Sequence, residues 1–283
     1  MAVAQAHWEQ FLWGGNMKPA EATLYEFGAG RDLIIPFYFY SVGVEKQILA
    51  DVQPLAKPEF INITIRRFIE LADELHFSRT PSKLLPESAQ KENLACLEDW
   101  YGIRYLAPAD VRKTGLDGAS VDFITSTSTL EHIPSSDIRL ILEECGRILR
   151  DDGLMSLEID YRDHYAYFDP SICVYNFMKY SPERWRLYNP STHFQNRLRH
   201  RDYLDLIARN GFVVVRESLE NGTEEDLRLL ESLSLDLSFR SMYTLQEMGI
   251  RSAHLVVAKH RHSGMECDRE KEVTRGEDDQ KSV

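Results

Sequence analysis

Residues 24–33, LYEFGAGRDL, contain an apolar strand that runs directly into a glycine-rich turn. Gly28 and Gly30 lie one residue apart, and an apolar run of helical character begins at Asp32. Glycines let the backbone come close to a ligand, and the N–H groups that open the next helix attract negative or polar groups. The stretch therefore predicts the cofactor-binding turn of an α/β fold.

Segments of strand and helix character alternate along the rest of the chain. Helical periodicity is clearest over Asp32–Ser41, Pro58–Glu74, Ser136–Arg150 and His200–Asn210, and Asp152-Gly153 is expected to turn the chain into the fifth strand. The expected strands are Leu24–Gly28, Gln47–Val52, Ile103–Leu106, Val121–Thr125, Leu154–Ile159, Phe212–Arg216 and His254–Ala258. This alternation predicts a Rossmann-like α/β fold with a seven-stranded, mostly parallel sheet and helices on both faces.

The alternation indicates a single domain over residues 1–261, with residues 1–22 as an N-terminal cap. Residues 161–199 interrupt it after the fifth strand and are rich in tyrosine and proline. Because open α/β sheets bind ligands at the carboxyl ends of their strands, this segment is expected to be a lid on the substrate side. A plain surface excursion is the alternative. Residues 262–283 are polar and charged and are not expected to fold.

Composition excludes some functions. Of the 283 residues, 43% are hydrophobic and 28% are charged, as in ordinary soluble proteins. The net charge of −12 argues against a nucleic-acid partner, which needs a basic face. The cysteines are widely spaced, and neither a signal peptide nor an apolar segment of bilayer length is visible. We therefore expect a cytoplasmic protein without a membrane partner.

Acidic residues near the turn separate two classes of cofactor. A dinucleotide site has the spacing G-x-G-x-x-G, but Leu33 stands where its third glycine would be. Glu26 would repel a pyrophosphate and attract a cationic amino group and a sulfonium. Asp51 suits the ribose hydroxyls of either cofactor, and Asp110 is placed to accept a hydrogen bond from an adenine amino group. The pattern favours S-adenosylmethionine over NAD.

With these motifs in order, Tyr25 to Leu157 resembles the class I S-adenosylmethionine-dependent methyltransferases. EFGAGRD, residues 26–32, matches the family's glycine-rich motif except that Asp32 replaces its third glycine. STSTLEHIP, residues 126–134, is similar to the stretch that lines the methionine end of the cofactor. The resemblance implies S-adenosyl-L-methionine as cofactor and S-adenosyl-L-homocysteine as product. It implies that the cofactor-binding residues are Glu26, Phe27, Gly28, Ala29, Gly30, Asp51, Val52, Asp110, Val111, Ser126 and Thr127.

Residues 158–169, EIDYRDHYAYFD, gather carboxylates, an imidazole and phenols directly after the fifth strand. This cluster could hold a cationic amine, or its histidine could act as a base toward a hydroxyl group. A metal on Asp160, Asp163 and Asp169 would match no recognised ligand spacing, so no metal ligand is predicted. The candidate catalytic residues are His164, Tyr165, Asp160 and, after the fourth strand, His132.

A second group of side chains lies further along the chain. Arg197, Arg199 and Arg201 lie near His193 and His200, and they could clamp a carboxylate or phosphate of the substrate. A solvated helix start is the equally weighted alternative.

Together these observations predict methyl transfer to an oxygen or nitrogen of a small polar metabolite. A protein that binds S-adenosylmethionine as a partner or sensor without turnover is the first alternative, and an NAD-dependent oxidoreductase is the second. The sequence leaves the oligomeric state open.

Overall fold

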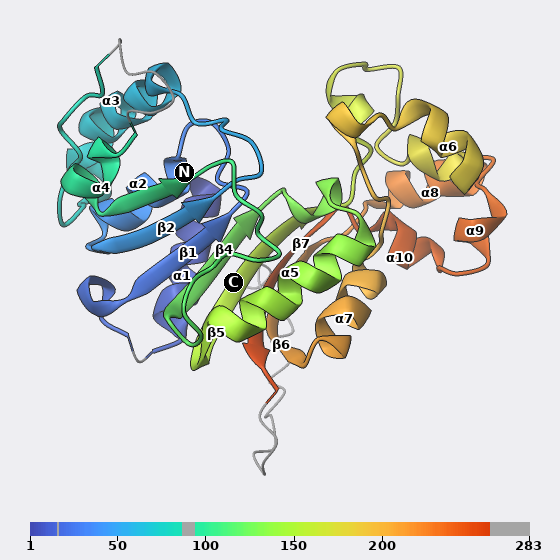
Figure 1. Cartoon of the computed structure of the whole chain (residues 1–283). Coiled ribbons are helices and arrows are strands. Elements are labelled where there is room, and N and C mark those ends of the chain that lie inside the picture. Colours follow the sequence, from blue (N-terminus) through green and yellow to red (C-terminus); the bar gives the residue numbers. More distant parts are fainter. Residues whose placement is uncertain (16, 87–93, 261–283) are drawn as a thin grey trace, which may run out of the picture.

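The computed structural model describes residues 1–15, 17–86 and 94–260, so the predicted tail over residues 262–283 lies outside the described residues (Figure 1). One sheet has the strand order β3-β2-β1-β4-β5-β7-β6. Neighbours from β3 to β5 pair in parallel, whereas β7 is antiparallel to both β5 and β6. The strands are β1 (Thr23–Phe27), β2 (Lys46–Ala50), β3 (Ile103–Leu106), β4 (Val121–Thr127), β5 (Leu149–Asp160), β6 (Phe212–Glu220) and β7 (Ser252–Lys259). The predicted mostly parallel, seven-stranded α/β sheet is confirmed.

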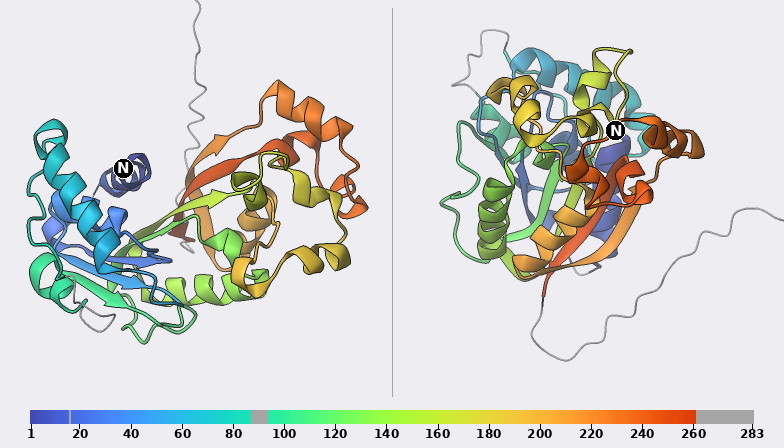
Figure 2. Two further views of the ribbon diagram at one scale, coloured as in Figure 1. Left: turned by 90° about the horizontal axis from the view of Figure 1, so that it is seen from above. Right: turned by 90° about the vertical axis from the view of Figure 1, so that its right-hand side faces the viewer.

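Helices cover both faces of this sheet, as Figures 1 and 2 show. On one face, α5 (Ser135–Ile148) and α7 (His200–Arg209) pack against Tyr25 and Ile48. On the other face, the neighbouring residues Leu24 and Leu49 pack against the remaining large helices. Those helices are α1 (Ala2–Trp13), α2 (Ile34–Ser41), α3 (Pro58–Leu75) and α4 (Cys96–Tyr101), and the short η1 (Pro19–Glu21) precedes β1. Cover on both faces explains why β1 is buried at every position.

The fifth strand corrects the sequence prediction. Helix α5 ends at Ile148 and β5 begins at the next residue, so Asp152-Gly153 lies inside the strand and does not turn the chain. The register of β4 against β5 shifts after Val121, and such a bulge absorbs additional residues. A Cβ at Gly153 would lie 2.8 Å from the carbonyl oxygen of Asp122. The lack of a side chain at Gly153 therefore allows β4 and β5 to approach each other closely at this point.

A layer of short helices lies beyond the carboxyl end of β5, at the upper right of Figure 1. Residues 161–199 supply η4 (His164–Tyr167), η5 (Asn176–Lys179), α6 (Pro182–Tyr188) and η6 (Ser191–His193). Residues between β6 and β7, which the sequence analysis did not assign, supply α8 (Glu224–Ser232), α9 (Leu237–Arg240) and α10 (Leu245–Gly249). The two segments share a buried cluster that includes Trp185, Leu230 and Phe239. They therefore form one packed unit beside the sheet edge.

No helix in the described part of the chain combines the length and the apolar character that a membrane span requires.

Glu144 on α5 anchors the loop that follows β3. Its Oε1 accepts hydrogen bonds from the main-chain N–H and the hydroxyl of Thr114, and Arg147 Nε lies 2.8 Å from Oε2. The hydrogen bond from Arg147 and those from Thr114 lower the pKa of Glu144 to about 2, against the effect of burial. Because this loop carries Asp110, the interaction stabilises one wall of the site described below.

Glu144→Gln is expected to lower the free energy of unfolding at pH 7 by about 1–3 kcal/mol. A carboxylate with a depressed pKa stabilises the fold fully above its unfolded pKa of 4.5 and loses this effect as the pH falls toward about 2. The difference between the variant and the wild type should therefore shrink between pH 5 and about 2 in urea denaturation. Glu143→Gln, which removes only an exposed pair with Arg139, is the control. Parallel pH profiles for Glu144→Gln and the wild type would contradict the assignment.

Candidate functional site

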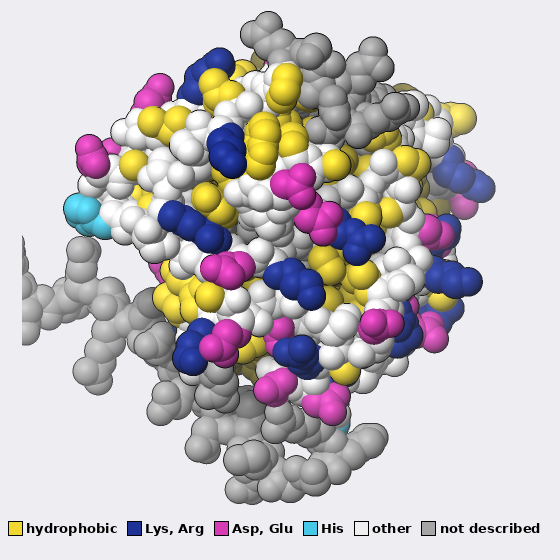
Figure 3. Space-filling view, turned by 60° about the vertical axis from the view of Figure 1, so that its left-hand side comes forward, with side chains coloured by type: hydrophobic (Ala, Val, Ile, Leu, Met, Phe, Trp, Pro, Cys, Tyr) yellow, Lys and Arg dark blue, Asp and Glu magenta, His cyan; other side chains and the backbone are white. Residues whose placement is uncertain are grey.

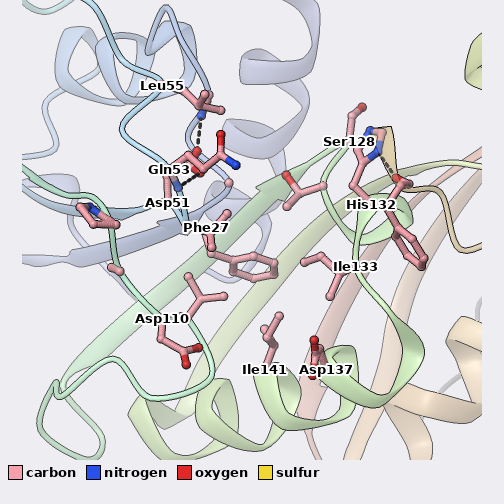
Figure 4. Close-up of a pocket in the computed structure, with 18 of the residues that line it drawn as sticks. Phe27, Asp51, Gln53, Leu55, Asp110, Ser128, His132, Ile133, Asp137 and Ile141 are labelled. Atoms are coloured by element: carbon pink, nitrogen blue, oxygen red, sulfur yellow. Dashed lines mark hydrogen bonds between the residues drawn. The ribbon is translucent and has the colours of Figure 1, made fainter. Parts of the chain in front are cut away.

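A cavity of about 900 Å³ lies at the carboxyl ends of β1, β2 and β4 (Figure 4). This is the edge of a parallel sheet where α/β proteins bind their ligands. Of the predicted cofactor residues, those on the cavity wall are Phe27, Gly28, Gly30, Asp51, Val52, Asp110, Val111 and Thr127. Glu26, Ala29 and Ser126 are buried and do not line the cavity. The structure thus brings together segments that are far apart in the sequence.

The two glycines of the turn have different surroundings. Both Gly28 and Gly30 have positive φ values, 75° and 72°, which favour glycine. A Cβ at Gly28 would overlap the side chain of Thr129, whereas a Cβ at Gly30 would meet no atom within 4 Å. Gly28 therefore allows the turn to pack against the segment after β4, and Gly30 leaves the cavity side of the turn open.

Leu33 occupies the position of the third dinucleotide glycine. It has a φ of 55°, it is 0% exposed, and it packs in the core with Phe37 and Ile61. Its side chain fills the space between α2 and α3, where a glycine would leave a void. The departure from the dinucleotide pattern therefore has a packing role in this chain.

Asp51 connects the turn to the loop after β2. Its carboxylate accepts hydrogen bonds from the N–H groups of Gly30 and Gln53, each at 3.2 Å. Burial raises the pKa of Asp51, while these N–H groups act to lower it. Figure 4 shows Asp51 and Gln53 side by side on the cavity wall. The carboxylate is thus placed to meet hydroxyl groups of a ligand, and Gln53 and Leu55 are wall residues that the sequence analysis missed.

Glu26 lies at the end of β1, behind the turn. It is 5% exposed, and its pKa is raised well above the ordinary value by burial and by the nearby Asp32 and Asp51. A cationic group bound beside the turn would favour the ionised carboxylate. The electrostatics therefore fit a positively charged ligand better than an anionic one.

Asp110 is on the opposite wall, in the loop after β3, and its carboxylate is half exposed. The Arg112 guanidinium donates to it at 2.9 Å and also contacts Asp137 at 3.1 Å. Hydrogen bonds from Arg112 lower the pKa of Asp110. Arg112 and Asp137 line the cavity as well, and no sequence motif had indicated them.

The far end of the cavity is formed by the segment after β4 and by part of the predicted lid. Ser128, Thr129 and His132 of the first segment face residues 191–194 of the second across this end. His132 Nδ1 lies 2.8 Å from the carbonyl oxygen of Phe194. This hydrogen bond joins η3 (Leu130–His132) to the predicted lid. Among the predicted catalytic residues, His132 is the one on the cavity wall.

Asp160, His164 and Tyr165 lie behind this wall. Arg162 Nε donates to Asp160 Oδ1 at 2.8 Å, and the Tyr167 hydroxyl donates to its other oxygen. His164 is buried, with its Nε2 3.4 Å from Asp160 Oδ2. Tyr165 donates its hydroxyl to the carbonyl of Tyr188, inside the predicted lid. The other two carboxylates considered as metal ligands have different partners. Asp163 accepts a hydrogen bond from the N–H of Tyr165, and the exposed Asp169 accepts one from the N–H of Ser171.

The structure does not support the arginine clamp, which was one of two open interpretations of Arg197, Arg199 and Arg201. Arg199 is 0% exposed and donates to the carbonyls of Tyr161, Met248 and Ile250. Arg197 donates to the carbonyls of Phe177 and Tyr180, and Arg201 pairs with Glu247. Buried carbonyl groups need donors, and these guanidinium groups supply them inside the layer of short helices. None of the three arginines lines the cavity.

His7 attaches the predicted N-terminal cap to the site. Its Nε2 lies 2.9 Å from the hydroxyl of Thr127 and its Nδ1 2.7 Å from that of Ser156, which is also 2.7 Å from His254 Nε2. Burial, followed by the effect of His254, lowers the pKa of His7 to about 3, so its ring is neutral at pH 7. This polar chain positions Thr127 from the face of the sheet opposite to α5. The sequence offered no signal for it, since His7 lies 120 residues from Thr127 and 149 residues from Ser156.

Comparison of the sequence with protein families gives one match. Residues 75–157 match the model of a family described as "Methyltransferase domain". The matched region contains Asp110, Thr127 and His132, and it ends within β5. No sequence among the curated proteins matches the chain.

Solved structures with the same fold include two methyltransferases. A geranyl diphosphate methyltransferase in complex with SAM is 16% identical, with a TM-score of 0.51 over 91% of this chain and 84% of that one. The geranyl diphosphate C-methyltransferase of Streptomyces coelicolor, in complex with Mg²⁺, geranyl diphosphate and S-adenosyl-L-homocysteine, is 15% identical, with a TM-score of 0.50 over 91% and 78%. At this identity the likeness concerns the fold, which is the Rossmann-like fold of methyltransferases.

Proposed function

We propose that this chain is a class I S-adenosylmethionine-dependent methyltransferase that methylates an oxygen or nitrogen atom of a small polar molecule, and the match of residues 75–157 to a methyltransferase domain and the fold support this. The observation that carries the proposal is the cavity, which has the glycine-rich turn at one end and residues 191–194 at the other. Its volume of about 900 Å³ is near the upper end of the ~300–1,000 Å³ usual for ligand sites. This volume supports the binding of a cofactor and a small acceptor together.

The residues of the cofactor end fit S-adenosylmethionine, which supplies an electrophilic methyl group. Gly30 leaves the turn open toward the cavity, and Asp51 offers a carboxylate for the ribose hydroxyls. Glu26 lies behind the turn and outside the cavity wall, and we propose that its acidic group acts through the turn on the positive charge of the methionine part. Asp110 and Val111 lie across the cavity, where we place the adenine. Because the glycine-rich turn, Asp51 and Asp110 line different parts of one cavity, they support a cofactor that lies extended along the sheet edge.

The acceptor end offers polar side chains to a heteroatom. Ser128, Thr129, Thr192 and His193 line it. We propose that the acceptor lies between these side chains and His132, and that residues 191–194 close the cavity over it. A closed site positions the two reactants and excludes water, and such positioning contributes up to ~7–11 kcal/mol in favourable intramolecular reactions.

The charge of the molecule supports a small acceptor. The net charge is −12, and Figure 3 shows acidic and basic side chains interspersed on the face that it presents. A nucleic-acid methyltransferase needs a continuous basic track for phosphate groups. We therefore propose that nucleic acid is not the acceptor.

Asp51→Asn is expected to raise the dissociation constant for S-adenosylmethionine roughly 10- to 100-fold, because a charge-assisted hydrogen bond contributes ~1.5–3 kcal/mol. Asparagine keeps an oxygen that can accept from the N–H of Gly30, so the turn should keep its shape. Calorimetry measures the affinity, and NAD is expected to give no binding heat. Asp151→Asn changes an exposed carboxylate that pairs with Lys259 and is the control. An unchanged affinity in Asp51→Asn would remove this residue from the site.

The acceptor itself can be identified with S-adenosylmethionine that carries an isotopic label in its methyl group. The pure protein and a fractionated extract should yield labelled small molecules together with S-adenosylhomocysteine. Label confined to the nucleic-acid or protein fraction would overturn the proposed acceptor class. Cofactor binding without any labelled product would indicate a sensor or a partner protein.

A further inference from the structure

Three side chains with metal-binding atoms converge beside the acceptor end of the cavity. Glu131 and His132 come from η3, directly after β4, and His164 comes from η4, directly after β5. One ligand atom of each lies within 4.8 Å of the other two. Because β4 and β5 are neighbours in the sheet, their carboxyl ends bring these short helices together. Within residues 1–15, 17–86 and 94–260, no other group of three histidine, cysteine or acidic side chains has such spacing.

The buried members of this group have polar atoms without partners. Glu131 is 2% exposed, and neither of its carboxylate oxygens has a hydrogen-bond partner in the described part of the protein. The Nε2 atom of His164, which is 7% exposed, makes no well-aligned hydrogen bond, although Asp160 Oδ2 lies 3.4 Å away. Buried polar groups nearly always have a hydrogen-bond partner, because leaving one unpaired destabilises the folded protein. The two unpaired oxygens of the buried Glu131 therefore indicate that a ligand completes the cluster.

His132 is already oriented as a ligand. Its Nδ1 lies 2.8 Å from the carbonyl oxygen of Phe194, and since a carbonyl oxygen accepts only, Nδ1 carries the proton. The Nε2 lone pair is then available, and a hydrogen bond from the other ring nitrogen to a backbone carbonyl is the usual support of a metal-bound histidine. The ring centres of His132 and His164 are 4.8 Å apart, and the two rings meet edge to face. Small side-chain rotations would bring both nitrogens to one ion.

We propose that Glu131, His132 and His164 bind a divalent first-row transition-metal ion. Two imidazoles and one carboxylate suit zinc, iron, cobalt or manganese, whereas magnesium and calcium prefer oxygen ligands alone. The carboxylate of Asp160, fixed by Arg162 and Tyr167, stands 3.4 Å from His164 and adds negative charge beside the ion. Binding would also relieve the burial of an uncompensated carboxyl group on Glu131.

Three protein ligands leave coordination positions open, as in catalytic metal sites. His132 lines the cavity, so an open position on its side can take an oxygen atom of the acceptor. A metal-bound hydroxyl group loses its proton more readily, and the proton passes to water. The oxygen then forms its bond to the methyl carbon as the sulfur–methyl bond breaks, which leaves neutral S-adenosylhomocysteine. This role rests on the proposed function, and it narrows the acceptor to a hydroxyl compound.

Metal binding can be tested without cofactor or acceptor, so its failure is distinct from a failure of the proposed function. The untagged full chain is stripped with a chelator and titrated with Co²⁺, whose visible absorption reports nitrogen and oxygen ligands. We expect one ion per chain, which Zn²⁺ displaces. Glu131→Gln and His164→Asn should each weaken binding more than about 100-fold, since even residues that only hydrogen-bond to a metal ligand contribute about 10- to 100-fold.

His76→Asn is the matched control, because His76 is exposed at the end of α3 in a left-handed conformation that asparagine tolerates. It should bind Co²⁺ like the wild type. Glu131→Gln keeps the shape of the side chain and removes a buried charge, so this variant should remain folded without metal. Absence of stoichiometric binding to the wild type would overturn the proposal. Equal binding by the wild type and both ligand variants would overturn it too.

Discussion

Arg199→Met is expected to lower the free energy of unfolding by about 3–5 kcal/mol. The guanidinium of Arg199 is 0% exposed and donates to the main-chain carbonyls of Tyr161, Met248 and Ile250. Methionine has no donor, and each buried carbonyl left unpaired costs about 1–3 kcal/mol, partly offset by the smaller cost of burying an uncharged side chain. Urea denaturation at pH 7 measures the change.

The control for this variant is Arg201→Met, two residues further along the chain. Arg201 is half exposed and pairs with Glu247, so its loss should cost no more than about 1 kcal/mol. Arg199→Lys keeps a charge but cannot reach three carbonyls at once, so it should fall between the wild type and Arg199→Met. Equal stability of Arg199→Met and Arg201→Met would show that Arg199 does not hold the layer of short helices to the sheet.

Gly28→Ala is the second change with a large expected effect. It places a Cβ at a φ of 75°, where the left-handed conformation costs ~1–2 kcal/mol, and the new atom overlaps Thr129. Overpacking adds about 1–3 kcal/mol, so the cofactor-free protein should lose about 2–5 kcal/mol of stability. The glycine-rich turn should also move away from the segment after β4, and S-adenosylmethionine binding should fall below detection by calorimetry.

Gly30→Ala distinguishes the cost of the left-handed backbone conformation from the cost of the steric overlap with Thr129. Gly30 has nearly the same φ, 72°, but a Cβ there meets no atom within 4 Å. Gly30→Ala should therefore lose only the ~1–2 kcal/mol that the left-handed backbone conformation costs a residue with a Cβ. Thermal unfolding of both variants without cofactor gives the comparison. If the two variants lose the same stability, contact between the turn and Thr129 has no energetic weight.

Local patterns were sufficient to predict the sheet and the glycine-rich turn. Strand and helix periods are properties of short segments, and the positions of Gly28, Asp51 and Asp110 relative to their strands follow from the sequence itself. The boundary between α5 and β5 was mispredicted because β5 already begins at Leu149, and Asp152-Gly153, a turn signal in sequence, falls at the register shift between β4 and β5. The helices between β6 and β7 were missed, since their apolar residues are covered mainly by one another and by residues 161–199.

The sequence by itself determined the fold class, the turn and the acids that line the cofactor end. Only the tertiary structure decided which distant side chains meet. Glu131 and His164 converge because β4 and β5 are neighbours, and His7 reaches Thr127 because α1 packs on those strands. Arg199 is buried because the short helices close around it, although a charged residue in a polar stretch predicts exposure. Strand order and the packing of helices set these contacts, and neither is encoded in the spacing of residues along a single segment.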